Sequence, residues 1–150
     1  MIITPSVKDK DIQLSQSDID AIQRKLKLKF PDILQCFFLR VNGGRPAKDL
    51  FNSGSVEAVV SEFLPLVSGN DHTAVQTYEH LVLKLGLLPK KMFPIAVEPT
   101  GDYFFIDCKN VDCSVYLFRH ELGIKENVVD LGVTFGQFLE RLEADSDLQI

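Results

Sequence analysis

The sequence predicts an α+β fold in a single domain, with an antiparallel or mixed sheet backed by N-terminal and C-terminal helices. Three observations predict this class. Helical periodicity occupies residues 17–41, three strand-like segments follow one another within residues 92–120, and a helix signal returns at Thr134. The chain of 150 residues is 45% hydrophobic and 25% charged, which suffices for one core without disulfide or metal support.

The first helix is expected to begin near Ser17, because Asp18 and Asp20 then place negative charge at its N-terminus. Three apolar residues recur at helical spacing and define its buried face, namely Ile19, Ile22 and Leu26.

Pro31 is expected to start a second helix, since proline suits the first helical position. Asn42 and Gly43 enter the left-handed region cheaply, so we expect them to end this helix. Cys36 falls within the apolar segment and is expected to be buried. The stripe at a 3.6-residue period consists of Ile33, Leu34, Phe37, Phe38 and Val41.

Residues 58–67 are rich in β-branched and aromatic side chains, which predicts a strand with Pro65 at an edge or end. A third helix is expected after residues 71–73, with Thr73 and Gln76 as a capping box and a C-terminal glycine at Gly86. Its expected apolar face is Ala74, Tyr78, Leu81, Val82 and Leu85.

The C-terminal half predicts strands at 92–97, 102–108 and 113–120, and a short strand at 128–132. The segment 102–108 is apolar on both faces, so it is expected at the centre of the sheet. Thr134 and Gln137 are expected to cap the last helix. The inward residues of this helix are Phe135, Phe138, Leu139 and Leu142.

Charge and hydropathy exclude several classes of partner. The formal net charge is −5, which does not suit a nucleic-acid-binding protein, because such proteins need a basic face against the phosphates. No segment approaches the ~20 apolar residues of a membrane span. Charged residues occupy the place of an export signal, and the three cysteines form no disulfide framework, so a cytoplasmic location is expected.

Candidate metal and redox residues are few. Cys108 and Cys113 flank a short turn, but two cysteines without further ligands are weak for zinc, so buried free thiols are expected. His72 and His80 are eight residues apart, which is too far for one metal on a helix, and His120 stands in no recognisable motif. We therefore expect no metal and no cofactor.

Catalytic signatures are also missing from the sequence. The Asn42–Arg45 loop follows a helix, whereas phosphate-binding glycine loops follow a strand. Acidic residues near the strand ends could act as a solvated surface, a partner-binding surface or an acid–base pair, and only a known separation would support the last. We expect no enzyme. These acids are Glu57, Glu62, Glu98, Asp102, Asp107, Asp112 and Glu121.

Several motifs in order resemble the SUKH superfamily, which includes the Smi/Knr cell-wall-regulator-like proteins. They are Phe30-Pro31-Asp32, Phe38 to Gly44, Phe93 to Ala96, Gly101 to Tyr103, Phe105 to Asp107, Val115 to His120 and Thr134 to Glu140. The resemblance implies a single SUKH-like domain over 1–150, with a core of about 14–142. Residues 45–88 follow no pattern of the family, so they are expected to carry specificity.

Bacterial members of this superfamily are similar to immunity proteins that bind a toxin domain. The resemblance implies a protein that binds and neutralises a cognate polymorphic toxin domain, such as a nuclease, by occlusion. Because a nuclease presents a basic face, we expect contacts from exposed acids and an aromatic residue, namely Glu57, Glu62, Asp102, Tyr103 and Glu121. A structural role is expected for Pro31, Phe38, Asn42, Gly43, Gly44, Gly101, Asp107 and Phe135.

Two alternatives stay open at this point. One is a regulatory scaffold or adaptor that acts through protein contacts. The other is a small-ligand-binding protein with a cleft beside the strand at residues 102–107. The sequence leaves the oligomeric state open, and it leaves Tyr103 open between the core and an interface.

Overall fold

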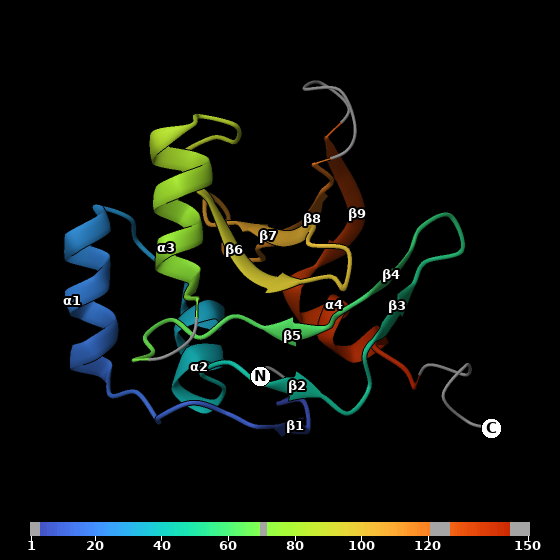
Figure 1. Cartoon of the computed structure of the whole chain (residues 1–150), viewed down its shortest axis with the longest axis horizontal. Helices are drawn as coiled ribbons and strands as arrows, with labels where there is room; N and C mark the ends of the chain where they lie inside the picture. The colour runs from blue at the N-terminus through green and yellow to red at the C-terminus, as the bar shows by residue number, and fades with distance from the viewer. Residues whose placement is uncertain (1–3, 70–71, 121–126, 145–150) are drawn as a thin grey trace.

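A five-stranded antiparallel sheet lies at the centre of the fold (Figure 1). The computed structural model describes residues 4–69, 72–120 and 127–144. The spatial order of the strands follows the chain, β5-β6-β7-β8-β9, so neighbouring strands are joined without crossing over. The strands are β5 (Glu62–Phe63), β6 (Met92–Val97), β7 (Tyr103–Asp107), β8 (Ser114–Phe118) and β9 (Val128–Thr134).

Two small antiparallel ladders lie beside this sheet. They consist of β1 (Val7–Lys8) with β2 (Arg45–Pro46), and of β3 (Leu50–Asn52) with β4 (Glu57–Val59). A bridge between Gly44 and Phe63 ties the first ladder to β5. A bridge between Leu50 and Glu143 ties the second to the end of the last helix.

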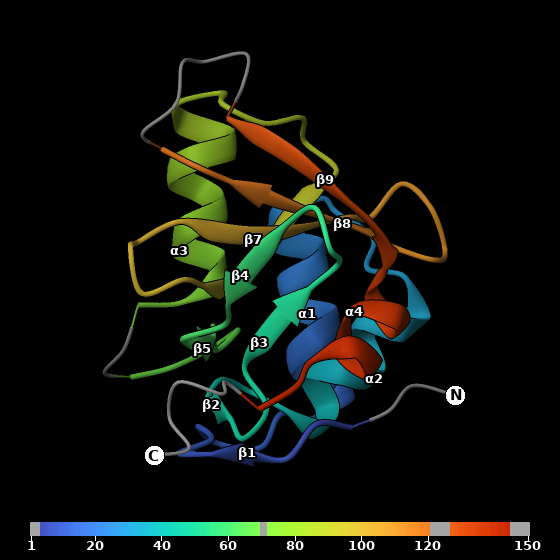
Figure 2. The ribbon, with the colours of Figure 1, turned by 90° about the vertical axis from the view of Figure 1, so that its right-hand side faces the viewer.

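The helices pack around the sheet, and α2 and α4 lie side by side (Figure 2). They are α1 (Gln16–Leu26), α2 (Asp32–Arg40), α3 (Ala74–Tyr78), the π-helical η1 (Glu79–Lys84) that continues α3, and α4 (Phe135–Arg141). The architecture confirms the predicted α+β class. Among the described residues, no helix has both the length and the apolar character needed to cross a bilayer.

Aromatic side chains fill the core. The Phe93 ring of β6 contacts Phe30, Phe38 and Tyr78, with ring centroids 4.9–6.2 Å apart. Phe37 of α2 contacts both Phe63 and Phe135 at 5.1 and 5.0 Å. The three middle residues of β7 are completely buried, so its predicted central position is confirmed. They are Phe104, Phe105 and Ile106.

Both predicted capping boxes are confirmed, at Thr73 with Gln76 and at Thr134 with Gln137. The first helix starts earlier than predicted, because Ser15 is its N-cap. The Asp18 carboxylate accepts from the Ser15 N–H at 2.8 Å, and the Ser15 hydroxyl accepts from the Asp18 N–H. Asp18 is therefore the third helical residue, as a capping box requires.

The middle of the chain departs from the prediction. Residues 58–67 do not form one strand, because β4 and β5 belong to different sheets. The third helix turns into the π-helical η1, which shifts its C-terminal residues around the axis. Leu85 was predicted on the buried face, but it is 48% exposed.

The cysteines divide into one exposed and two buried thiols. Cys36 was predicted to be buried, and this is wrong: it is exposed, because the buried side of α2 is formed by Leu34, Phe37 and Phe38. Cys108 and Cys113 are free and buried, as predicted. Burial raises the pKa of both thiols, that of Cys113 to about 12.

Candidate functional site

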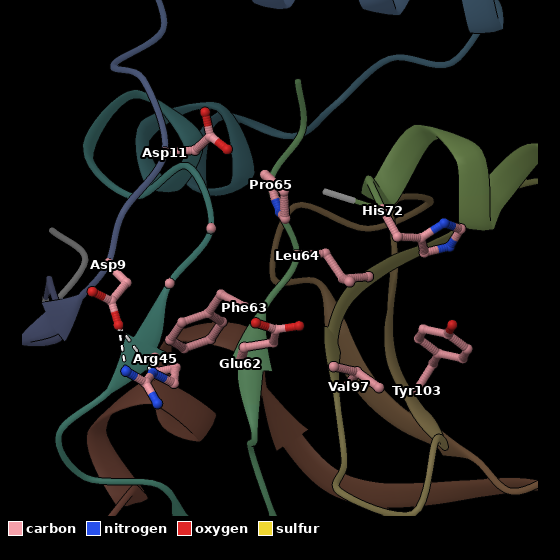
Figure 3. A pocket seen from close by; sticks show the side chains of 12 residues that line it. Asp9, Asp11, Arg45, Glu62, Phe63, Leu64, Pro65, His72, Val97 and Tyr103 are labelled. Atoms are coloured by element: carbon pink, nitrogen blue, oxygen red, sulfur yellow. Dashed lines mark hydrogen bonds and ion pairs between the residues drawn. The ribbon is translucent and has the colours of Figure 1, made fainter. Parts of the chain in front are cut away.

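An open hollow of about 670 Å³ lies between the β1–β2 ladder and the edge strand β5 (Figure 3). Its volume falls within the ~300–1,000 Å³ of ordinary ligand pockets. We call it the acidic cleft. Its lining residues come from the N-terminal segment, the loop after α2, the β5 region and the sheet, and they are Asp9, Asp11, Gly43, Gly44, Arg45, Glu62, Phe63, Leu64, Pro65, His72, Val97 and Tyr103.

Glycines allow the backbone to close the floor of the cleft. Gly43 and Gly44 have φ of 75° and 119°, values that disfavour other residues. A Cβ on Gly44 would clash with the Val7 side chain and lie 2.6 Å from the Lys8 carbonyl oxygen. Gly44 therefore lies tightly against β1, and it also exchanges backbone hydrogen bonds of 3.2 and 2.7 Å with Phe63 of β5.

Asn42 holds the wall of the cleft in place. It is 3% exposed, and its side chain bonds three backbone groups of two other segments. Of the two residues predicted to enter the left-handed region after α2, Gly43 does so with φ of 75°, but the prediction is wrong for Asn42. Val41 leaves the helix in an extended conformation, which frees Asn42 to turn inward.

Acidic groups dominate the cleft. Three carboxylates line it, against one arginine, Arg45. Arg45 is paired with Asp9, with its Nη2 at 2.5 Å and its Nε at 3.1 Å from Asp9 Oδ2 (Figure 3). Asp11 and Glu62 have no such pairing within the lining, so they give the hollow a negative potential.

Local hydrogen bonds keep Asp11 ionised. The Ser68 hydroxyl and the Ile12 N–H, at 2.8 Å from Asp11 Oδ1, donate to its carboxylate. Both bonds stabilise the charged form and hold the pKa of Asp11 below its ordinary value. The cleft therefore presents this charge throughout the physiological pH range.

The structure brings two of the predicted partner-binding residues together. Glu62 and Tyr103 both line the acidic cleft, and Tyr103 is half-buried with its hydroxyl directed toward His72 (Figure 3). Glu57 is exposed on β4 and does not line the cleft. Glu121 lies outside the described residues.

Asp102 was expected on the surface, but it is 7% exposed. Its Oδ1 accepts from the His120 backbone N–H at 3.1 Å and lies 2.5 Å from His120 Nδ1. The register of β7 and β8 causes this burial, since pairing Tyr103 with Phe118 places residue 102 beside the end of β8. Asp102 thus fixes the orientation of the His120 ring.

The remaining motif residues have structural contacts. Pro31 is the N-cap of α2, and Phe38 and Phe135 are fully buried. Gly101 has φ of 91° in the β6–β7 turn, where its N–H donates to the Glu98 carbonyl. Asp107 closes the next turn by accepting from the Lys109 N–H at 2.8 Å.

The sequence predicts no common site for His72, His80 and His120, but the structure brings them together. A second hollow, of about 350 Å³, adjoins the acidic cleft, and all three histidines line it. We call it the histidine hollow. No sequence signal could have found it, because these residues come from the segment before α3, from η1 and from the segment after β8. Within the described part of the chain, no group of histidine, cysteine or acidic residues is placed to hold a metal ion.

Comparison with models of protein families identifies the family of this chain. Residues 13–141 match the model of the SMI1 / KNR4 family (SUKH-1). The chain belongs to this family. The SUKH-1 match includes the loop at residues 42–44 and all strands of the central sheet, but Asp9 and Asp11 lie before it. No curated protein matches this SUKH-1 chain.

Proposed function

We propose that this SUKH-1 protein is a cytoplasmic immunity protein that binds a basic toxin domain and blocks it by occlusion, without catalysis. One observation carries the proposal: Asp11 and Glu62 converge with Tyr103 in one open hollow of a chain with net charge −5. Charge complementarity of this kind accelerates association with a basic partner. An aromatic residue beside the charges supplies an anchor.

Occlusion requires only that the partner's functional face be covered. A toxin that acts on nucleic acid must attract phosphates, so its active face carries arginine and lysine. Such side chains would enter the acidic cleft, and the toxin would lose access to its substrate. Two of the three cleft acids lie outside the family match, which is consistent with specificity that differs from one member to another.

The size of the cleft favours a second candidate, the binding of a small cationic ligand. A volume of about 670 Å³ is sufficient for such a molecule. This ligand would use the same carboxylates and Tyr103. A scaffold or adaptor role would also use this surface, but with a partner that is not a toxin.

Affinity purification from the native host, with the tagged protein as bait and mass spectrometry as readout, tests the proposal. We expect one basic toxin-like domain in stoichiometric amount, and protection of cells when this domain is co-expressed. The double variant Asp11→Lys, Glu62→Lys should lose both capture and protection. The matched variant Glu57→Lys, Glu140→Lys changes the same total charge outside the cleft and should retain them.

Recovery of several unrelated proteins would support an adaptor function and contradict the immunity function. Recovery of no protein, together with a small molecule that co-purifies with the wild type and not with the cleft variant, would replace it with ligand binding.

A further inference from the structure

The acidic cleft and the histidine hollow are two halves of one groove. His72 and Tyr103 line both, so the hollows adjoin along these two side chains. The histidine hollow is lined by His72, Thr77, His80, Leu81, Thr100, Gly101, Tyr103, Phe118 and His120. Among the residues that the structure describes, its lining includes neither lysine nor arginine, and its remaining walls are largely apolar or aromatic.

Hydrogen bonds to Thr77 fix the orientation of the first imidazole. The Thr77 hydroxyl lies 2.6 Å from His72 Nε2 and donates to the Thr73 carbonyl oxygen at 3.0 Å. A hydroxyl has one proton, so both contacts are satisfied only when His72 Nε2 is the donor to Thr77. In the neutral ring, Nδ1 then carries the lone pair and is an acceptor.

Asp102 fixes the second imidazole in the same way. Its buried carboxylate can only accept, so His120 Nδ1 is the donor in their 2.5 Å contact. His120 Nε2 is then the acceptor of the neutral ring. The backbone N–H of His120 donates to the same oxygen, which further restricts the ring. Two histidines of the hollow are therefore held as hydrogen-bond acceptors.

The third imidazole, that of His80, belongs to the π-helical segment η1. His80 is exposed and lies in η1, where its carbonyl oxygen accepts a π-type hydrogen bond from the Leu85 N–H at 3.0 Å. π-Helical turns frequently mark functional sites. Here the turn places His80 and Leu81 at the hollow together.

We propose that the histidine hollow is a subsite for an arginine side chain of the protein partner, adjoining the acidic cleft. This inference rests on the proposed function and names the chemistry that the partner must carry. Arginine has five N–H donors and no acceptor, which matches walls that offer imidazole lone pairs. Its planar guanidinium also stacks on aromatic faces, and Tyr103 and Phe118 provide such faces.

Lysine fits the subsite less well, because its ammonium is strongly hydrated and does not stack. An acidic side chain would meet acceptors and the nearby carboxylates of Asp11 and Glu62.

The test titrates the ¹⁵N-labelled full chain with the capped tripeptide Gly-Arg-Gly, and with Gly-Lys-Gly as the comparison. We expect chemical-shift changes at Gly101, Tyr103 and His120, with binding of the arginine peptide tighter by roughly threefold or more. His80→Lys, at an exposed position, should abolish the preference, whereas His80→Gln should keep it.

Equal affinity for both peptides, or shift changes confined to residues outside the hollow, would overturn the subsite. This failure is separate from failure of the proposed function. If the protein captures a toxin domain but binds both peptides equally, the immunity function is supported and the arginine subsite is refuted. Specific binding of Gly-Arg-Gly without any toxin would keep the subsite and redirect the function.

Discussion

The backbone N–H of Leu66 donates to the side-chain oxygen of Asn42 at 2.7 Å, so one amide joins the end of α2 to the segment after β5. The Asn42 Nδ2 donates to the carbonyl oxygens of Ile12 and Val67, both at 2.9 Å. Three backbone groups from two segments thus depend on one buried side chain. Since Pro65 precedes Leu66 and lines the acidic cleft, this amide also shapes the candidate site.

Asn42→Ala is expected to lower the free energy of unfolding by about 3 kcal/mol, because buried backbone groups lose their partner. Urea unfolding followed by circular dichroism measures the effect. Asn52→Ala is the matched control: this asparagine is exposed and caps a hairpin turn by accepting from the Gly54 N–H. Equal losses for the two variants would show that Asn42 is not a structural link.

Gly44→Ala should destabilise the protein more than Gly54→Ala. Both glycines have positive φ, 119° and 91°, so both substitutions add backbone strain of about 1 kcal/mol or more. Only the Cβ at position 44 meets other atoms, since nothing lies within 4 Å of the one at position 54. Thermal unfolding of both variants measures the difference, and similar melting temperatures would contradict the close approach of Gly44 to the β1 segment at Val7 and Lys8.

Glu98→Gln should stabilise the protein at neutral pH. Burial is the main cause that raises the pKa of Glu98, so the folded state favours its protonated form. Ionised Glu98 therefore destabilises the folded state at pH values above the pKa of Glu98 in the folded protein. This destabilisation disappears as the pH falls toward the pKa of glutamate in the unfolded chain, ~4.3.

A glutamine at position 98 can still accept from the Val59 N–H, as Glu98 Oε2 does at 3.2 Å. The gain in the free energy of unfolding over wild type should therefore shrink between pH 7 and about pH 4. Urea titrations at several pH values test this. A gain that grows on acidification would show that the Val59 hydrogen bond outweighs burial.

Glu62→Lys should slow association with a basic partner by roughly tenfold at low salt, because it reverses a charge inside the cleft. Glu57→Lys makes the same change outside the cleft and should have a smaller effect. Stopped-flow or surface plasmon measurements over a range of salt concentrations compare the two, and the difference should decrease as salt screens the charges. Equal effects would mean that net charge, rather than the cleft, controls association.

One of the three cysteines should react rapidly with a thiol reagent in the folded protein. Cys36 is exposed, whereas Cys108 and Cys113 are buried, and burial raises the pKa of both. Reactivity follows the thiolate, so the buried pair should react only on unfolding. A kinetic assay with a chromogenic disulfide should show one fast phase, lost in Cys36→Ser, and two fast thiols would contradict the burial.

The sequence by itself determined the elements of the C-terminal half. Alternation and turn residues located the strands within residues 92–120, and Thr134 with Gln137 located the last helix. Both signals are local: they depend on neighbours two to four positions apart. The double-sided apolar pattern of residues 102–108 also gave their central place in the sheet, because burial on both faces requires it.

Only the tertiary structure determined which residues come together at the candidate site. Residues 58–67 divide between two sheets, and the π-helical η1 exposes Leu85; each reflects pairing or packing with distant segments. The acidic cleft gathers residues from Asp9 to Tyr103, and the histidine hollow brings His120 to the imidazoles of His72 and His80. Local periodicity contains no information on which loops meet, because that is fixed by strand register and by buried links such as Asn42 with Leu66.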